Sequence, residues 1–239
     1  MAYTNAVLDD AQLQAGLRGI NPKFGDYCIR AAGEVWGLPL LSQKLKALIT
    51  IVLDVVHQDQ VGPGNPFGAH VNMALQQGAN RDEIEEVLLF ACAYAGFNKA
   101  AGAFGALNDL LGPSPYPADY RLDFSEAKLQ ESRLQEYVAE VGDSEYSHLF
   151  YRIAREVWGL PLLPTQDKAF LAIAIDIASQ TQSSGEVDPF AVHVKIAANQ
   201  GVTKEAIAEL IQFCGVYAGF SKTVAFFVKL KALAAQGLI

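Results

Sequence analysis

Two histidines stand at the same place in two similar stretches of the chain. His70 lies within residues 67–71, FGAHV, and His193 lies within residues 190–194, FAVHV. Each follows a loop of helix-breaking residues and a proline, so we expect each imidazole near the start of a helix. Free N–H groups there could hold a carboxylate, and imidazole is the natural acid or base near neutral pH. Both are candidates for proton transfer, although a histidine among small residues is also a common packing group.

A tyrosine follows each histidine, in the string YAGF at residues 94–97 and again at 217–220. Its hydroxyl could reach a substrate or simply pack in the core. Lys99 comes two residues after the first string and could bind a carboxylate. We predict that His70 moves a proton while Tyr94 and a lysine orient the acid. The candidate catalytic residues are His70, His193, Tyr94 and Tyr217, and the candidate substrate-binding residues are Lys46, His57, Phe67, Phe97 and Lys99.

The first copy carries polar side chains that the second copy lacks. His57 and Asp59 precede the loop before His70, whereas the matching positions in the second copy are Ser179 and Thr181. If only one copy is active, we expect it to be the first. Imidazole and carboxylate groups suit zinc or iron, but the spacing of these side chains matches no metal motif. We therefore predict neither a metal nor another cofactor.

Two aspartates, Asp54 and Asp176, recur inside strongly apolar segments. An unpaired charge in such a place is expensive. We expect each to form a structural ion pair, with Lys46 and Lys168 or a neighbouring module as partners, and leave a catalytic role as the alternative.

The chain is one module written twice. The heptapeptide EVWGLPL occurs at residues 34–40 and again at 156–162, and the stretches that follow match almost residue for residue. Two occurrences are too few for a solenoid, which normally needs three or more units. We predict a first module over residues 1–112, a proline-rich linker over 113–122 and a second module over 123–239.

The apolar pattern predicts helix nearly everywhere. Apolar residues run almost continuously over 45–56 and 169–178, which favours buried helices over strands. A helix over residues 67–77 should end at Gly78, and Asn80 with Glu83 should form a capping box for the next helix. Residues 121–140 are charged and helix-prone. The predicted fold class is all-α, with a helical hairpin in each module.

Composition narrows the partners and the location. The formal net charge is -8 and Lys and Arg do not cluster, which disfavours nucleic acid and anionic membranes as partners. The longest apolar run, residues 87–97, is too short to cross a bilayer, and residues 1–20 lack the apolar core of a secretory signal, so we expect a cytoplasmic protein. With 51% apolar and 18% charged residues, much of the surface should lie in subunit contacts. With nucleic acid and membranes disfavoured, we expect the ligand to be a small molecule.

The order of these features resembles the carboxymuconolactone decarboxylase family, within the alkylhydroperoxidase D-like superfamily. The resemblance rests on an apolar helix, the FGAHV and FAVHV strings, helices ending in Gln-Gly, and the YAGF strings. It implies an all-helical fold whose single modules assemble as hexameric rings. A chain with two modules would then form the same six-module ring as a homotrimer.

The resemblance also separates two branches of chemistry. The peroxidase branch uses a CxxC pair before its histidine and a glutamate in the preceding helix. The thiol positions here are Pro63 and Pro66 in the first copy, and the glutamate position is Ala47; the second copy has Glu186, Pro189 and Ala169. A thiol peroxidase needs a thiolate nucleophile and a resolving partner. Thiol peroxidase activity is therefore disfavoured, and the decarboxylase branch is the better match.

These observations favour an enzyme. Breaking a carbon–carbon bond to release carbon dioxide leaves an enolate, which needs hydrogen-bond donors and an acid that protonates carbon. We predict a cofactor-independent, decarboxylase-like lyase that uses histidine-centred acid/base chemistry on a small cyclic carboxylic acid or lactone. The alternatives are an isomerase or cyclase acting on an apolar biosynthetic intermediate, and a non-catalytic ring that binds a ligand.

Overall fold

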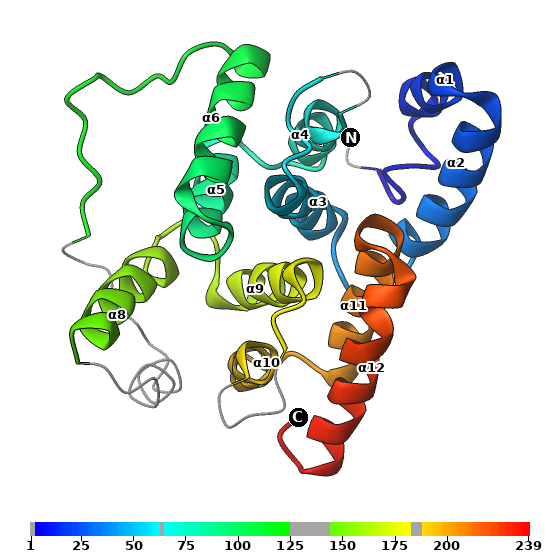
Figure 1. The fold of residues 1–239 in the computed structure, drawn as a ribbon. Helices are drawn as coiled ribbons and strands as arrows, with labels where there is room; N and C mark the ends of the chain where they lie inside the picture. The colour runs from blue at the N-terminus through cyan, green and yellow to red at the C-terminus, as the bar shows by residue number, and fades with distance from the viewer. Residues whose placement is uncertain (1–2, 63–64, 125–143, 183–187) are drawn as a thin grey trace.

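The computed structural model describes residues 3–62, 65–124, 144–182 and 188–239, and these residues fold into helices without strands (Figure 1). The first module holds α1 (Ala11–Ile20), α2 (Pro22–Trp36), α3 (Gln43–His57), α4 (Phe67–Gln76), α5 (Arg81–Ala95) and α6 (Phe97–Leu111). The second holds α8 (Ser144–Trp158), α9 (Thr165–Ser179), α10 (Pro189–Asn199), α11 (Lys204–Ala218) and α12 (Phe220–Ala235). Helices α2 to α6 correspond in order to α8 to α12. The predicted all-α tandem duplication is confirmed.

Helices α3 and α9 form the centre of the molecule (Figure 1). Every residue from Leu45 to Val56 is buried, and so is every residue from Lys168 to Ala178. The two helices pack against each other, and each is covered by the helices of its own module, α4 and α6 on α3, and α10 and α12 on α9. The continuous apolar runs that predicted buried helices therefore form the core that joins the modules.

Local sequence sets the helix ends. The Ser42 side chain caps α3 by accepting the N–H of Leu45. The predicted capping box of Asn80 and Glu83 is present at the start of α5. Gly78 has a φ of 88°, the left-handed conformation expected after α4. These caps satisfy backbone groups that the helices leave unpaired, which fixes where each helix begins and ends.

The proline-rich linker runs over the surface of the first module. Gly112 leaves α6 with a φ of 84°, and the Tyr116 hydroxyl donates a 2.9 Å hydrogen bond to Asp82 at the start of α5. Residues 121–124 are not helical, in contrast to the helix predicted over 121–140, and the rest of that predicted helix lies outside the described residues. The loops before the two histidines are described only in part.

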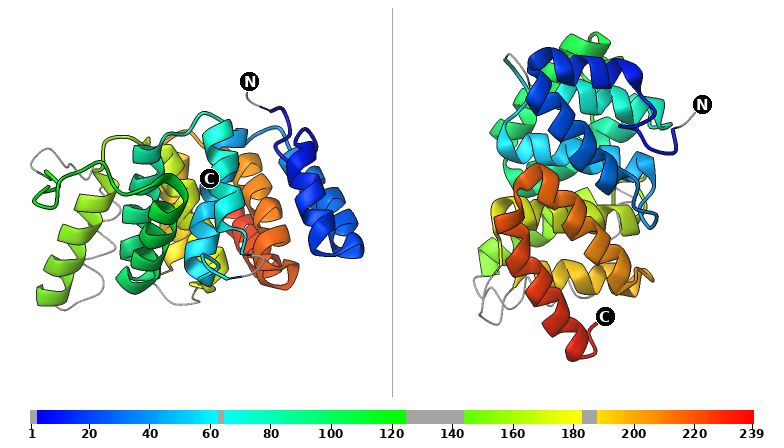
Figure 2. Two further views of the ribbon diagram at one scale, coloured as in Figure 1. Left: turned by 90° about the horizontal axis from the view of Figure 1, so that it is seen from above. Right: turned by 90° about the vertical axis from the view of Figure 1, so that its right-hand side faces the viewer.

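The equivalent helices α2 and α8 each pack on the other module. Helix α2 contacts α11, and α8 contacts α5. Seen from above in Figure 2, the helices stand side by side in a row with α8 at one edge and α1 and α2 at the other. The WGLPL corner after α2 or α8 therefore meets the opposite module. No helix within the described ranges has the length and apolar character needed to cross a membrane.

Two buried ion pairs join each of these corners to the opposite module. Lys46 Nζ lies 3.2 Å from Glu209 Oε1 in the second module, and Lys168 Nζ lies 3.2 Å from Glu86 Oε1 in the first. None of the four side chains is more than 4% exposed. Burial lowers the pKa of both lysines, and the glutamate beside each opposes that shift. The predicted pairing of Lys46 with Asp54 is wrong, because the glutamate of the other module takes the ammonium.

Backbone groups of the corner complete each ion pair. Glu209 accepts the N–H groups of Leu40 and Leu41 at 2.8 and 2.9 Å, one on each carboxylate oxygen. Glu86 accepts those of Leu162 and Leu163 in the same way. Each ammonium also donates to two carbonyl groups of its own corner, those of Trp36 and Leu38 or of Trp158 and Leu160. The buried charges are thereby fully hydrogen-bonded, which is the condition for tolerating them.

Removing one partner should be costly. We expect Glu209→Gln to lower the free energy of unfolding, measured by urea denaturation, by about 3–5 kcal/mol, because the Lys46 ammonium loses its counter-charge. The new amide NH2 would also face a backbone N–H. Glu205→Gln is the matched control on the same helix, since Glu205 is 66% exposed, and its effect should stay within about 0.5 kcal/mol. Equal losses in the two variants would contradict a buried, stabilising pair.

Candidate functional site

The first site consists of Asp54, His70, Tyr217 and Trp36. Asp54 lies one turn before the end of α3, and His70 lies in the first turn of α4. The two side chains meet, with 2.7 Å between Asp54 Oδ2 and His70 Nδ1. Asp54 is 4% exposed and His70 is 8% exposed. A carboxylate at Nδ1 fixes the ring orientation and favours the tautomer whose Nε2 can accept a proton.

The Asp54 carboxyl is perturbed by its surroundings. Burial raises the pKa of Asp54 above its usual value, His70 opposes the shift, and the nearby Asp59 carboxylate raises the pKa further. Sequence reasoning treated Asp54 as an ion-pair partner of lysine. The structure instead makes it the partner of the His70 imidazole.

Tyr217 reaches the first site from the second module. Its ring meets His70 edge to face, with the centroids 5.6 Å apart. Trp36 Nε1 donates a 2.6 Å hydrogen bond to the Tyr217 hydroxyl oxygen. Because that oxygen acts as an acceptor, its own proton can be donated elsewhere. Burial raises the pKa of Tyr217, so the hydroxyl keeps this proton at neutral pH.

The outer nitrogen of His70 is open. Within the described part of the chain, His70 Nε2 has no hydrogen-bond partner. The His70 side chain as a whole is 10% exposed. The first site therefore presents an oriented imidazole nitrogen and a phenol that can donate, which is a suitable pair for acid/base chemistry.

The second site consists of Asp176, His193, Tyr94 and Trp158, with the modules exchanged. Asp176 Oδ2 is 2.6 Å from His193 Nδ1, and Trp158 Nε1 donates a 2.7 Å hydrogen bond to the Tyr94 hydroxyl. The Tyr94 hydroxyl lies 3.4 Å from His193 Nε2, and the Trp158 ring stacks on the imidazole at 6.1 Å. Here both ring nitrogens have protein neighbours, unlike those of His70.

This exchange corrects one prediction. The sequence analysis paired Tyr94 with His70, its neighbour in the same module, whereas the structure places Tyr94 on His193 and Tyr217 on His70. The physical reason is that the end of α5 or α11 points into the opposite module. Trp36 and Trp158, which the sequence analysis did not include among the site residues, supply the hydrogen bonds that orient the tyrosines.

The remaining predicted substrate-binding residues separate into two groups. His57 ends α3, and burial lowers its pKa, as do Lys222 of the second module and Lys99, while Asp59 opposes them. Lys99 Nζ donates to the Val56 carbonyl at 2.6 Å. The other group is displaced from the site: Lys46 is fully buried in its ion pair, Phe67 is fully buried in the core, and Phe97 is 67% exposed.

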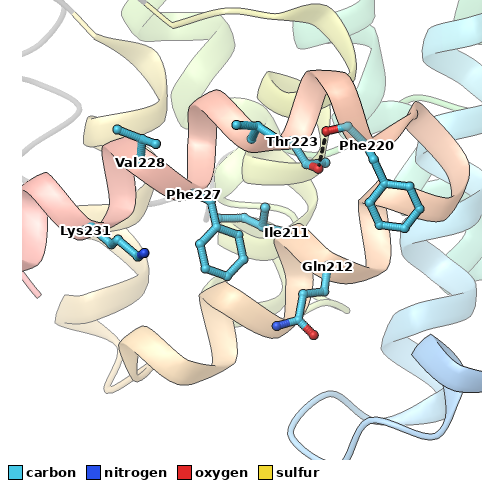
Figure 3. A pocket seen from close by; sticks show the side chains of 8 residues that line it. Ile211, Gln212, Phe220, Thr223, Phe227, Val228 and Lys231 are labelled. Atoms are coloured by element: carbon cyan, nitrogen blue, oxygen red, sulfur yellow. Dashed lines mark hydrogen bonds between the residues drawn. The ribbon is translucent and has the colours of Figure 1, made fainter.

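Two hollows lie away from the imidazoles. One is a shallow groove of about 340 Å³ between α11 and α12, with Phe220 towards one end and Lys231 towards the other (Figure 3). The other, of about 590 Å³, lies between α5, the linker and the second WGLPL corner. In the described ranges, no three His, Cys, Asp or Glu side chains gather as metal ligands, and His57, Asp59 and His70 do not form such a group.

The comparisons with known proteins agree with the fold. The carboxymuconolactone decarboxylase family matches residues 22–109 and 145–232. The 4-carboxymuconolactone decarboxylase of Acinetobacter baylyi is 38% identical over 64 residues, which are 27% of this chain and 44% of that protein. The chain thus matches less than half the length of this curated relative.

A solved structure extends the likeness over both modules. A protein described as a gamma-carboxymuconolactone decarboxylase subunit, from Burkholderia xenovorans LB400, superposes with a TM-score of 0.53 at 19% identity, covering 96% of this chain and 94% of that one. At this identity the likeness concerns the fold. With family matches in both halves that together span most of the sequence, the chain belongs to the carboxymuconolactone decarboxylase family and carries two of its modules in tandem.

Proposed function

We propose that this protein is a cofactor-independent lyase that decarboxylates a small cyclic carboxylic acid or lactone at the first site. The observation that carries the proposal is the His70 imidazole, held at Nδ1 by Asp54, open at Nε2 and in contact with the ring of Tyr217. Family membership and the name of the Acinetobacter relative support the substrate class. The reaction requires an acid and a donor close together, and the first site supplies both.

Each group has a defined part in the proposed reaction. The bond between the ring carbon and the substrate carboxylate breaks, carbon dioxide leaves, and the electron pair passes into the conjugated lactone as an enolate. Tyr217 O–H donates to the oxygen on which negative charge develops. His70, protonated at Nε2, delivers its proton to carbon, and Asp54 stabilises the imidazolium beforehand. A proton from solvent then restores His70.

Positive charge for the substrate carboxylate is available one turn beyond Asp54. His57 lies there on α3, and Lys99 and Lys222 both act on its titration. The lysines come from different modules and are partly buried. We propose that the Lys99 and Lys222 ammonium groups bind the carboxylate before it is lost, with the neutral His57 ring beside them. A partly buried cation binds an anion more strongly than an exposed one does.

Removing the His70 imidazole tests the reaction. With 4-carboxymuconolactone as the substrate, we expect His70→Gln to reduce kcat/KM by about 10²–10⁴-fold, because the proton donor is lost. His148→Gln is the control, since His148 is exposed on α8. Carbon dioxide release and the product spectrum should be followed together. Full turnover in His70→Gln would remove His70 from the mechanism.

The same assay of the native chain separates the alternative functions. An isomerised product without carbon dioxide would favour the isomerase. No turnover of any lactone would favour the ligand-binding ring.

The influence of the second module on His57 gives a pH-dependent prediction. Because Lys222 lowers the pKa of His57, we expect Lys222→Gln to raise it, as measured by NMR titration of the imidazole. When the pKa of a histidine is lower in the folded than in the unfolded protein, the free energy of unfolding falls as the pH drops below the unfolded-state pKa of about 6.5. The variant should therefore lose less stability on acidification than the native chain. Lys231→Gln, farther along α12, should leave the titration unchanged. An unshifted His57 in Lys222→Gln would mean that the two groups do not interact.

Assembly is the second part of the proposal. The outer face of α12 exposes Phe220, Val224 and Val228, each more than 60% exposed, beside the groove in Figure 3. Contiguous apolar surface of this kind is typical of subunit contacts. We propose a homotrimer that forms a six-module ring.

Light scattering tests the assembly. We expect a particle of three times the 25.8 kDa chain mass, and Val228→Glu should reduce it towards one chain, because the new charge would lose its hydration in the contact. Glu205→Gln, at an exposed position that does not line the groove, serves as the control. A monomeric native chain, or a trimer unaffected by Val228→Glu, would contradict the proposed contact.

A further inference from the structure

One difference between the two sites is the side chain two residues after the central helix of each module. Asp59 and Thr181 occupy the same backbone position: each comes after a left-handed glutamine, and its N–H donates to the carbonyl of the site aspartate at 2.9 and 3.0 Å respectively. The backbone turn is therefore the same in both sites. At this position the two sites differ only in the side chain.

Thr181 completes the second site. Its hydroxyl donates a 2.7 Å hydrogen bond to Asp176 Oδ1, while Asp176 Oδ2 binds His193 Nδ1 at 2.6 Å. Both carboxylate oxygens are thus occupied. The opposite side of the imidazole faces the Tyr94 hydroxyl at 3.4 Å and the Trp158 ring. His193, which is 4% exposed, is thus contacted at both ring nitrogens and by the Tyr94 and Trp158 rings.

Asp59 does the opposite in the first site. An ionised carboxylate has no proton to donate, so Asp59 cannot hold Asp54 as Thr181 holds Asp176. It is exposed, and its negative charge acts against the Asp54 carboxylate. Tyr217 contacts His70 only through the ring edge, and the described residues give Nε2 no hydrogen bond. The first imidazole is held at one nitrogen only.

We propose that Thr181 is a positioning residue that immobilises the second imidazole, and that Asp59 at the equivalent position leaves the first imidazole able to exchange protons. Each chain then has one working site and one locked copy. The activity of the first site rests on the proposed function, whereas the difference in imidazole mobility does not.

Solvent exchange of the imidazole Nδ1–H protons measures this difference directly. We use the full chain with 15N-labelled histidine, assign His70 and His193 by single substitutions, and add no substrate. The His193 proton should exchange at least about tenfold more slowly than the His70 proton, the factor expected from one additional hydrogen bond to a charged group. Equal exchange rates at the two histidines would overturn the proposal.

Reciprocal substitutions assign the effect to one side chain. Thr181→Val should speed exchange at His193 by about tenfold, and Thr181→Ser should restore the slow rate, since both native and rescued chains carry a hydroxyl donor. Asp59→Thr should slow exchange at His70 by a similar factor. Asp59→Ala is its control, because it removes the charge without adding a donor, and it should not slow exchange.

The outcomes separate cleanly. An unchanged His193 rate in Thr181→Val, or equal slowing by Asp59→Ala and Asp59→Thr, would show that the hydroxyl does not position the pair. If Thr181→Val does not fold, Asp59→Thr decides, because it adds a hydrogen bond rather than removing one. Full turnover by His70→Gln would overturn the proposed function while leaving these exchange rates valid.

Discussion

The reciprocal burial of a lysine from one module against a glutamate from the other governs the whole architecture. A buried ammonium is tolerated only with a counter-charge and saturated hydrogen bonds. Lys46 finds both only when α11 of the second module brings Glu209 to it, and Lys168 depends in the same way on α5. Neither module can bury its own lysine alone, so the modules must form their cores together around α3 and α9.

The same ion pairs determine where the tyrosines go. Glu209 and Tyr217 lie on α11, about two helical turns apart, and Glu86 and Tyr94 have the same spacing on α5. Once the glutamate is fixed against the opposite corner, the end of its helix must lie over the opposite imidazole. The tryptophan beside that corner then meets the tyrosine hydroxyl. An interaction that holds the fold together thereby builds each site from two modules.

Much of the fold was predictable because it depends on local or one-dimensional patterns. The continuous apolar run over residues 45–56, the capping box at Asn80 and the glycine after α4 each act within one helix. The pairing of sites was not predictable, because the repeat places identical residues in both modules. Tyr94 and Tyr217 are equivalent in sequence, so no residue type shows which imidazole each one meets. The glutamate partners of the lysines were not predicted either, because the amphipathic pattern of α5 and α11 does not show that Glu86 and Glu209 face the other module.

The sequence shows that the two sites differ, with His57 and Asp59 in the first copy and Ser179 and Thr181 in the second. The contact that Thr181 makes, however, depends on the backbone turn after α9. Thr181 returns to Asp176 only because Gln180 is left-handed and reverses the chain after α9. In an assembly of separate single modules, a substitution at this position would change every site at once. Joining two modules in one chain removes that constraint, because one copy can carry a hydroxyl that binds its aspartate while the other carries a carboxylate. The shared core requires the lysine and the glutamate in both copies, so the ion pairs match while the residues after α3 and α9 differ.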